Sequence, residues 1–137
     1  MLHKQQKAFS NITAKSTIIR NGFFENAKID SSKSTLEIDG NAKISQIDLS
    51  KDMIIIKFEK FADGRGFSLA KLLRQNGYKG IIRAKGNLLV DQYPLAIRCG
   101  VDEVEISFAH AQHQPKEQWR EALTRANNNY LDRLMLA

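Results

Sequence analysis

The stretch MIIIKF, residues 53–58, decides the fold, because it is a continuous apolar run with the length of a buried strand. Two further strands are predicted after it, GIIRA at residues 80–84 and EVEISF at residues 103–108. Amphipathic segments separate the three strands and predict helices near residues 67–76 and 91–99. Strands and helices that alternate at this spacing form parallel neighbours with right-handed crossovers. We therefore predict an α/β fold with a small parallel βαβαβ core.

Capping residues, glycine and proline mark the ends of the two predicted helices. Ser68 is placed to cap the start of the first helix, and Gly77 to close its end in the left-handed conformation. Asp91 is placed to cap the second helix, with Pro94 in its first turn and Gly100 after its last. Each loop that follows a strand of the core therefore leads into a helix.

An N-terminal β-hairpin is predicted ahead of the core. Asn21 and Gly22 lie between two apolar runs, and both residue types tolerate the positive φ of a tight hairpin turn. Three parallel strands rarely suffice alone, so we expect this hairpin or a second subunit to extend the sheet. Residues 36–38 are a candidate short strand, and Ile44 with Ile47 a candidate helical turn over the core.

A long amphipathic helix is predicted at the C-terminus, with Pro115 at its first position. Apolar residues recur in it at intervals of three or four and share one face: Trp119, Leu123, Ala126, Tyr130 and Leu134. Packing against the core is the simpler interpretation of that face. A partner helix or a second copy of the chain is the alternative, so homo-oligomer formation stays open.

Length and composition are those of one domain, 137 residues with 42% apolar and 26% charged residues. We predict a single α/β domain over residues 18–137 and a polar, mobile arm over residues 1–17. The sequence lacks the run of roughly 18 apolar residues that a membrane helix needs. The N-terminus does not resemble a secretory signal, and a single cysteine fits a reducing compartment. We expect a cytoplasmic protein without a membrane partner.

The net charge of +6 is unevenly distributed along the chain. Residues 51–100 carry ten Lys and Arg against four Asp and Glu. Such a basic stretch attracts an anion or a nucleic acid, or is simply a solvated surface. Aromatic residues are not interleaved with the basic ones as stacking platforms would be, so a nucleic acid partner is not expected.

The loops after the strands hold the candidate binding residues, because ligands of parallel α/β sheets bind beyond the carboxyl ends of the strands. We expect Arg65, Arg83 and Lys85 to converge there on an oxyanion, and Arg74 to lie on the exposed side of its helix. The alternative is that the glycines only shape turns and that Arg65 pairs with Asp63. The predicted anion site comprises Asp63, Gly64, Arg65, Gly66, Ser68, Arg83, Lys85, Asp91 and Gln92.

Motifs for catalysis or for a cofactor do not accompany this site. The Gly64-x-Gly66 pair lacks the third glycine and the later acidic residue of a dinucleotide fingerprint. The lone Cys99 cannot run dithiol exchange unaided and is expected to be a buried, inert thiol. His110 and His113 lack a third metal ligand nearby. The sequence therefore predicts no metal site and leaves the cofactor and any reaction unknown.

Three segments of the chain resemble one bacterial family. They are FADGRGFS at residues 61–68, the run over residues 77–92 that contains GYKG and RAKG, and RCGVD at residues 98–102. These segments resemble the family called domain of unknown function 934. The resemblance spans residues 53–108, and both the spacing and the residue types match. Asn87 and Val90 stand where that family usually carries Asp and Arg.

The resemblance implies a place in sulfur assimilation. Members of the family tend to be encoded beside assimilatory sulfite reductase, and some are labelled oxidoreductases on that association. We therefore expect an accessory protein of assimilatory sulfite reduction and cysteine biosynthesis that binds an oxyanion or a partner protein, such as sulfite reductase. The alternative is an oxidoreductase of the same pathway whose cofactor is unidentified or supplied by a partner.

Overall fold

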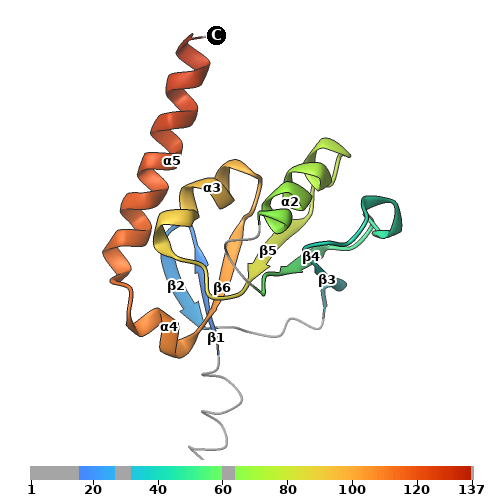
Figure 1. Cartoon of the computed structure of the whole chain (residues 1–137), viewed down its shortest axis with the longest axis horizontal. Coiled ribbons are helices and arrows are strands. Elements are labelled where there is room, and N and C mark those ends of the chain that lie inside the picture. The colour runs from blue at the N-terminus through green and yellow to red at the C-terminus, as the bar shows by residue number, and fades with distance from the viewer. Residues whose placement is uncertain (1–15, 27–31, 60–63, 137) are drawn as a thin grey trace, which may run out of the picture.

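The computed structural model describes residues 16–26, 32–59 and 64–136, with side chains described as far as Ala126. These residues form a six-stranded sheet in the order β2-β1-β6-β5-β4-β3 (Figure 1). The strands are β1 (Ser16–Arg20), β2 (Phe23–Asn26), β3 (Thr35–Asp39), β4 (Met53–Lys57), β5 (Ile81–Lys85) and β6 (Glu103–Ser107). The helices are α2 (Arg65–Gln75), α3 (Tyr93–Arg98), α4 (Phe108–Gln112) and α5 (Lys116–Leu136), with short 3-10 turns η1 (Ile44–Gln46) and η2 (Val90–Gln92).

Strands β4, β5 and β6 are parallel neighbours, with α2 and α3 in the two crossovers between them. The predicted parallel core is therefore confirmed, and each strand lies within one residue of its expected bounds. Strand β3 adds a fourth parallel strand beside β4 and confirms the candidate strand over residues 36–38. The η1 turn and the buried side chain of Ile47 confirm the candidate turn over the core.

The N-terminal hairpin extends the sheet on its other side. Asn21 and Gly22 form the turn with φ values of 52° and 79°, so both adopt the left-handed conformation that this residue pair tolerates. Strand β1 pairs antiparallel with both β2 and β6. It begins at Ser16, so Ser16 and Thr17 belong to the sheet and not to the predicted arm. The rest of that arm, residues 1–15, lies outside the described residues.

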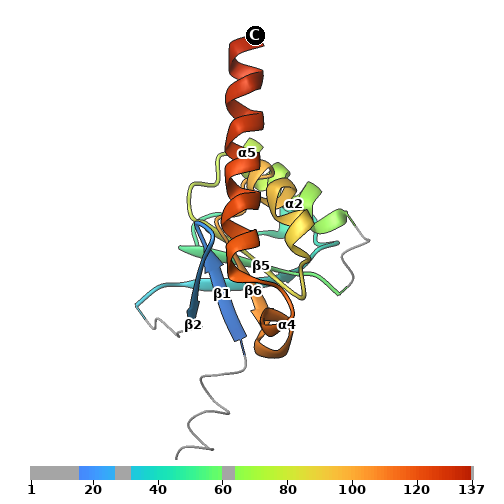
Figure 2. The same cartoon turned by 90° about the vertical axis from the view of Figure 1, so that its left-hand side faces the viewer.

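Helices α2, α3 and α5 contribute to a single hydrophobic core on one face of the sheet (Figures 1 and 2). Trp119 of α5 and Tyr93 of α3 are the largest fully buried side chains, and their rings meet edge to face at 5.2 Å between centroids. Each such side chain contributes roughly 1.5–3 kcal/mol through burial. The sheet supplies Ile19, Ile54, Ile56, Ile82, Ala84, Val104 and Ile106 to this core.

The C-terminal helix packs against the core along the predicted face. Trp119 and Ala126 are buried and Leu123 is partly buried, which confirms the simpler interpretation for the first half of α5. The side chains of Tyr130 and Leu134 lie outside the described residues. No helix in the described part of the chain is long and apolar enough to cross a lipid bilayer.

Two predicted helix starts are wrong by a few residues. Helix α2 begins at Arg65, so Gly64 occupies the N-cap position and Ser68 lies inside the first turn, where its N–H binds the Gly64 carbonyl at 3.1 Å. Helix α3 begins after η2, which places Asp91 in the 3-10 turn and not at the cap. Helix α4 was not predicted, and the Ser107 side chain caps it.

Candidate functional site

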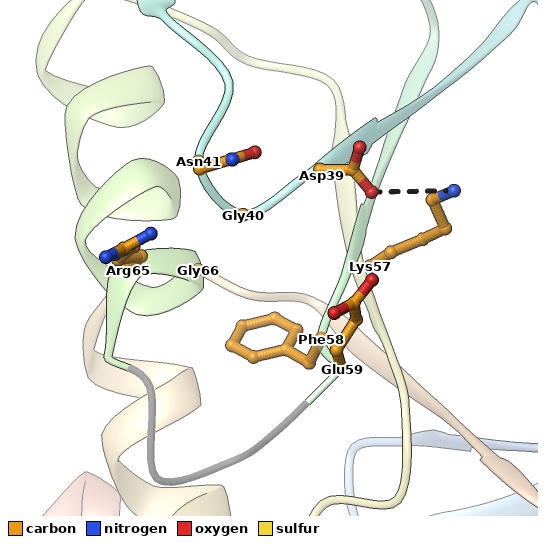
Figure 3. A pocket seen from close by; sticks show the side chains of 8 residues that line it. All are labelled: Asp39, Gly40, Asn41, Lys57, Phe58, Glu59, Arg65 and Gly66. Atoms are coloured by element: carbon orange, nitrogen blue, oxygen red, sulfur yellow. Dashed lines mark ion pairs between the residues drawn. The ribbon is translucent and has the colours of Figure 1, made fainter.

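A pocket lies beyond the carboxyl ends of β3 and β4, against the start of α2 (Figure 3). Its volume is about 330 Å³, at the small end of the range for ligand sites. This is the edge of a parallel sheet where α/β proteins hold their ligands. The pocket is lined by Asp39, Gly40, Asn41, Lys57, Phe58, Glu59, Arg65 and Gly66.

Two glycines form the contact between the β3 loop and the first turn of α2. A Cβ atom on Gly66 would lie 2.2 Å from Cζ of Phe58, and one on Gly40 would lie 3.2 Å from the nitrogen of Gly66. The Phe58 ring also packs against Phe67 at 4.9 Å between centroids. Larger residues would push the two segments apart, so these glycines have a packing role.

Charged side chains of both signs surround the pocket. Lys57 Nζ lies 3.5 Å from Asp39 Oδ1, and these side chains are 47% and 63% exposed, so the pair is screened by water. Arg65 lies on the α2 side of the pocket, opposite Asp39 and Glu59, which lie on the strand side (Figure 3). The pocket is therefore polar, with Arg65 on one side and the Asp39–Lys57 ion pair and Glu59 on the other.

The first turn of α2 adds backbone donors at the same place. Gly64 carries no side chain that could cap this turn, and the positive end of the helix dipole lies there. Arg65 is the first residue of the helix and adds a guanidinium group to this end. Ser68 lines an adjacent shallow hollow together with Gly40 and Asn41. Backbone N–H groups and a guanidinium together suit a bound oxyanion.

Arg83 and Lys85 do not line the pocket, although they were predicted to converge with Arg65. Arg83 is the middle residue of β5, and its guanidinium forms ion pairs with Glu103 at 2.7 Å and Glu105 at 3.0 Å on β6. Lys85 Nζ lies 3.2 Å from Glu37 Oε1. The convergence prediction is corrected here, because strand alternation directs Arg83 along the face of the sheet and not beyond its edge.

The carboxylate of Glu103 is the centre of a buried ionic cluster on the sheet. Its side chain is fully buried and accepts hydrogen bonds from Arg20 of β1 and Arg83 of β5. The hydrogen bond that Arg20 donates to the Glu103 carboxylate raises the pKa of Arg20, although burial opposes the rise. Because Arg20 and Arg83 lie on the two strands beside Glu103, this cluster joins three adjacent strands and has a structural role.

The remaining predicted site residues lie elsewhere. Asp91 is exposed in η2, and the Gln92 side chain accepts a hydrogen bond from the Leu89 N–H at 3.2 Å. Neither residue lines the pocket. Asp63 lies outside the described residues, so its predicted pairing with Arg65 stays a prediction.

Cys99 is half-buried at the end of α3. Burial raises the pKa of its thiol, and the nearby charges of Lys71 and Arg98 oppose this rise only in part. His110 Nε2 lies 2.9 Å from the carbonyl oxygen of Leu88. Among the described residues, no three His, Cys, Asp or Glu side chains are grouped to hold a metal ion.

Besides Gly40 and Phe58, sequence reasoning missed four lining residues with polar or charged side chains: Asp39, Asn41, Lys57 and Glu59. All four follow or end β3 and β4, and they meet only because those strands are adjacent. The available signal was the candidate strand over residues 36–38, which ends in the turn residues Asp39-Gly40-Asn41. Placing that strand beside β4 would have brought the site together.

The model of a bacterial protein family of unknown function, DUF934, matches residues 35–135. The chain belongs to this family. The DUF934 match starts at the first residue of β3 and reaches into the last turn of α5, so it is wider than the segments that carry the resemblance. It contains the whole pocket and leaves out the N-terminal hairpin. No curated protein and no solved structure matches the chain.

Proposed function

We propose that this DUF934 protein is an accessory protein of assimilatory sulfite reduction that binds a small oxyanion-bearing ligand in the pocket beyond β3 and β4. The observation that supports binding is the position of Arg65, which lines the pocket as the first residue of α2. The pathway rests on the family resemblance and on nothing in the geometry. The site lies at the sheet edge where α/β proteins bind ligands.

The chemistry of the pocket suits a sulfur or phosphorus oxyanion. A guanidinium group offers two parallel N–H donors to such an anion, and the α2 backbone adds more. A shielded charge-assisted hydrogen bond contributes about 1.5–3 kcal/mol, and an exposed one much less. Because the Lys57 side chain is 47% exposed, we expect weak binding that falls as the salt concentration rises.

Growth of the native bacterium tests the proposal. Deleting the gene is expected to slow growth on sulfate or sulfite as the sulfur source but not on cysteine. A copy that carries Arg65→Met is expected to restore growth poorly, whereas Arg125→Met, at an exposed position of α5 away from the pocket, restores it fully. Equal growth of the deletion strain on all three sulfur sources contradicts the pathway.

Sulfite reductase, or another protein of sulfur assimilation, is the partner that this proposal names. The basic central stretch of the chain offers charge for such an encounter. Affinity purification of the tagged full chain from the native host is expected to recover sulfite reductase in low salt and to lose it in high salt. Recovery of the tagged chain alone under both conditions contradicts a direct partnership.

A further inference from the structure

The charges of the described residues that line the β3–β4 pocket are balanced. Lys57 and Arg65 are cationic, whereas Asp39 and Glu59 are anionic. A bare oxyanion that enters this pocket therefore meets as much negative as positive charge. Repulsion by a like charge within a few ångströms offsets part of any attraction by Arg65. A ligand that carries a positive charge beside its oxyanion therefore matches the pocket better than one that carries negative charge alone.

The positions of these groups keep Arg65 apart from Glu59. Asp39 and Lys57 form an ion pair of 3.5 Å, so each neutralises much of the other's charge. Glu59 has no hydrogen bond or ion pair with any other described residue. Arg65 lies on the α2 side of the pocket and Glu59 on the strand side (Figure 3). Arg65 and Glu59 therefore form a positive and a negative pole on opposite sides of the pocket (Figure 3).

The rim between the poles is polar as well. The Asn41 side chain lies beside the pocket above Gly40, and its amide offers both donors and an acceptor (Figure 3). Phe58 is the one large apolar side chain among the lining residues, and it is buried. A volume of about 330 Å³ admits a small, hydrophilic molecule and little apolar bulk.

We propose that the pocket binds a small zwitterion, a molecule with an oxyanion at one end and an ammonium group at the other. This inference rests on the proposed function, since it keeps an oxyanion at Arg65 and adds the second group that the pocket selects. The oxyanion lies at Arg65 and the first turn of α2. The ammonium group lies at Glu59, with the Asp39 carboxylate nearby.

Matched probes that differ only in the ammonium group test the inference. Taurine carries a sulfonate and an ammonium group, whereas 2-hydroxyethanesulfonate carries a hydroxyl in place of the ammonium. Each is titrated into the full ¹⁵N-labelled chain while the amide resonances of Gly40 and Gly66, which line the pocket, are followed by NMR. We expect taurine to shift both resonances to saturation, with a dissociation constant about fivefold lower than that of 2-hydroxyethanesulfonate.

Two variants separate the poles of the site. Glu59→Gln is expected to abolish the preference for taurine while leaving the affinity for 2-hydroxyethanesulfonate the same or higher, because it removes a negative charge. Arg65→Met is expected to weaken the binding of both probes. Glu121→Gln, at an exposed position of α5 outside the pocket, changes neither. Because Glu59 and Arg65 are exposed, both variants should fold, and their amide spectra show whether they do.

Each remaining outcome contradicts the inference, and the outcomes can be told apart. Equal affinity for both probes shows a plain oxyanion site, which overturns the zwitterion and keeps the proposed function. Taurine binding that Glu59→Gln leaves unchanged places the ammonium group elsewhere and also overturns it. If neither probe nor sulfite or sulfate shifts Gly40 and Gly66, the pocket is not an oxyanion site and both proposals fail.

Discussion

Arg74 donates two hydrogen bonds to the carbonyl oxygen of Gly100, from Nε at 3.1 Å and from Nη2 at 2.9 Å. The same guanidinium binds the carbonyl oxygens of Tyr78 at 2.9 Å and Gly80 at 2.8 Å, and it forms an ion pair with Asp102 at 2.6 Å. One side chain thus ties the end of α2 to the segments that enter β5 and β6. The prediction that Arg74 lies on the exposed side of its helix is wrong.

Replacing Arg74 should therefore destabilise the fold. Arg74→Met leaves three carbonyl oxygens without this donor, and we expect a loss of about 2–3 kcal/mol in the free energy of unfolding. Lys71→Met removes the same charge from an exposed position of α2 and is expected to change stability by less than about 0.5 kcal/mol. Urea unfolding followed by circular dichroism measures both, and equal stability of the two variants would falsify the structural role of Arg74.

The buried ionic cluster on the sheet gives a second test. Glu103→Gln removes the negative charge that Arg20 and Arg83 share, so Arg20 loses this buried partner and Arg83 is left with Glu105. We expect a loss of about 3 kcal/mol in the free energy of unfolding, as when one partner of a buried ion pair is removed. Glu121→Gln on exposed α5 is the control. A melting temperature like that of the wild type would show that the cluster adds nothing to stability.

The close contact at Gly66 predicts that a single methyl group added there destabilises the fold. Gly66→Ala brings the new Cβ atom within 2.2 Å of the Phe58 ring, so either the ring or the helix start has to move. We expect a loss of about 2 kcal/mol, typical of overpacking. Gly64→Ala adds the same methyl group at φ −73° with open space around it, and it should leave stability unchanged or slightly higher. Differential scanning calorimetry measures the stability of both variants. Equal losses of stability would contradict the packing role of Gly66.

The Cys99 thiol should react slowly in the folded chain. Burial raises its pKa, so at pH 8 the folded chain holds less thiolate than the unfolded chain does. As the pH rises through the raised pKa, the thiolate fraction of the folded chain approaches that of the unfolded chain. The two alkylation rates then approach each other. Iodoacetamide labelling followed by mass spectrometry, with and without urea, measures both rates. Faster labelling of the folded chain at pH 8 would mark Cys99 as an activated thiol.

The parallel core could be predicted because its signals are local. The apolar run over residues 53–58 and the glycine that ends α2, with Gly77 at φ 88°, follow from short stretches of sequence. The start of α2 could not be predicted in the same way. Two glycines flank Arg65 and disfavour a helix by propensity, and the packing of Gly66 on Phe58 outweighs that preference.

Only part of the pocket could be predicted, because only some of its residues have a local signal in the sequence. Arg65 follows a predicted strand and opens a predicted helix, so its position at the sheet edge could be inferred. Asp39 and Lys57 come together through the pairing of β3 with β4, which no local pattern specifies. Arg83 was misplaced although a signal existed, because Glu103 and Glu105 are two residues apart on a neighbouring strand and so face the same way.

Strand β1 lies between β2, its neighbour in the sequence, and β6, where Arg20 meets a glutamate 83 residues further along the chain. During synthesis on the ribosome, the N-terminal hairpin emerges early but has no partner until residue 107 has left the exit tunnel. Until then the edges of β1 and β5 both stay open to pairing with other chains. This topology therefore delays completion of the sheet until β6 has emerged, and a nascent chain that stalls before β6 is the species most exposed to aggregation.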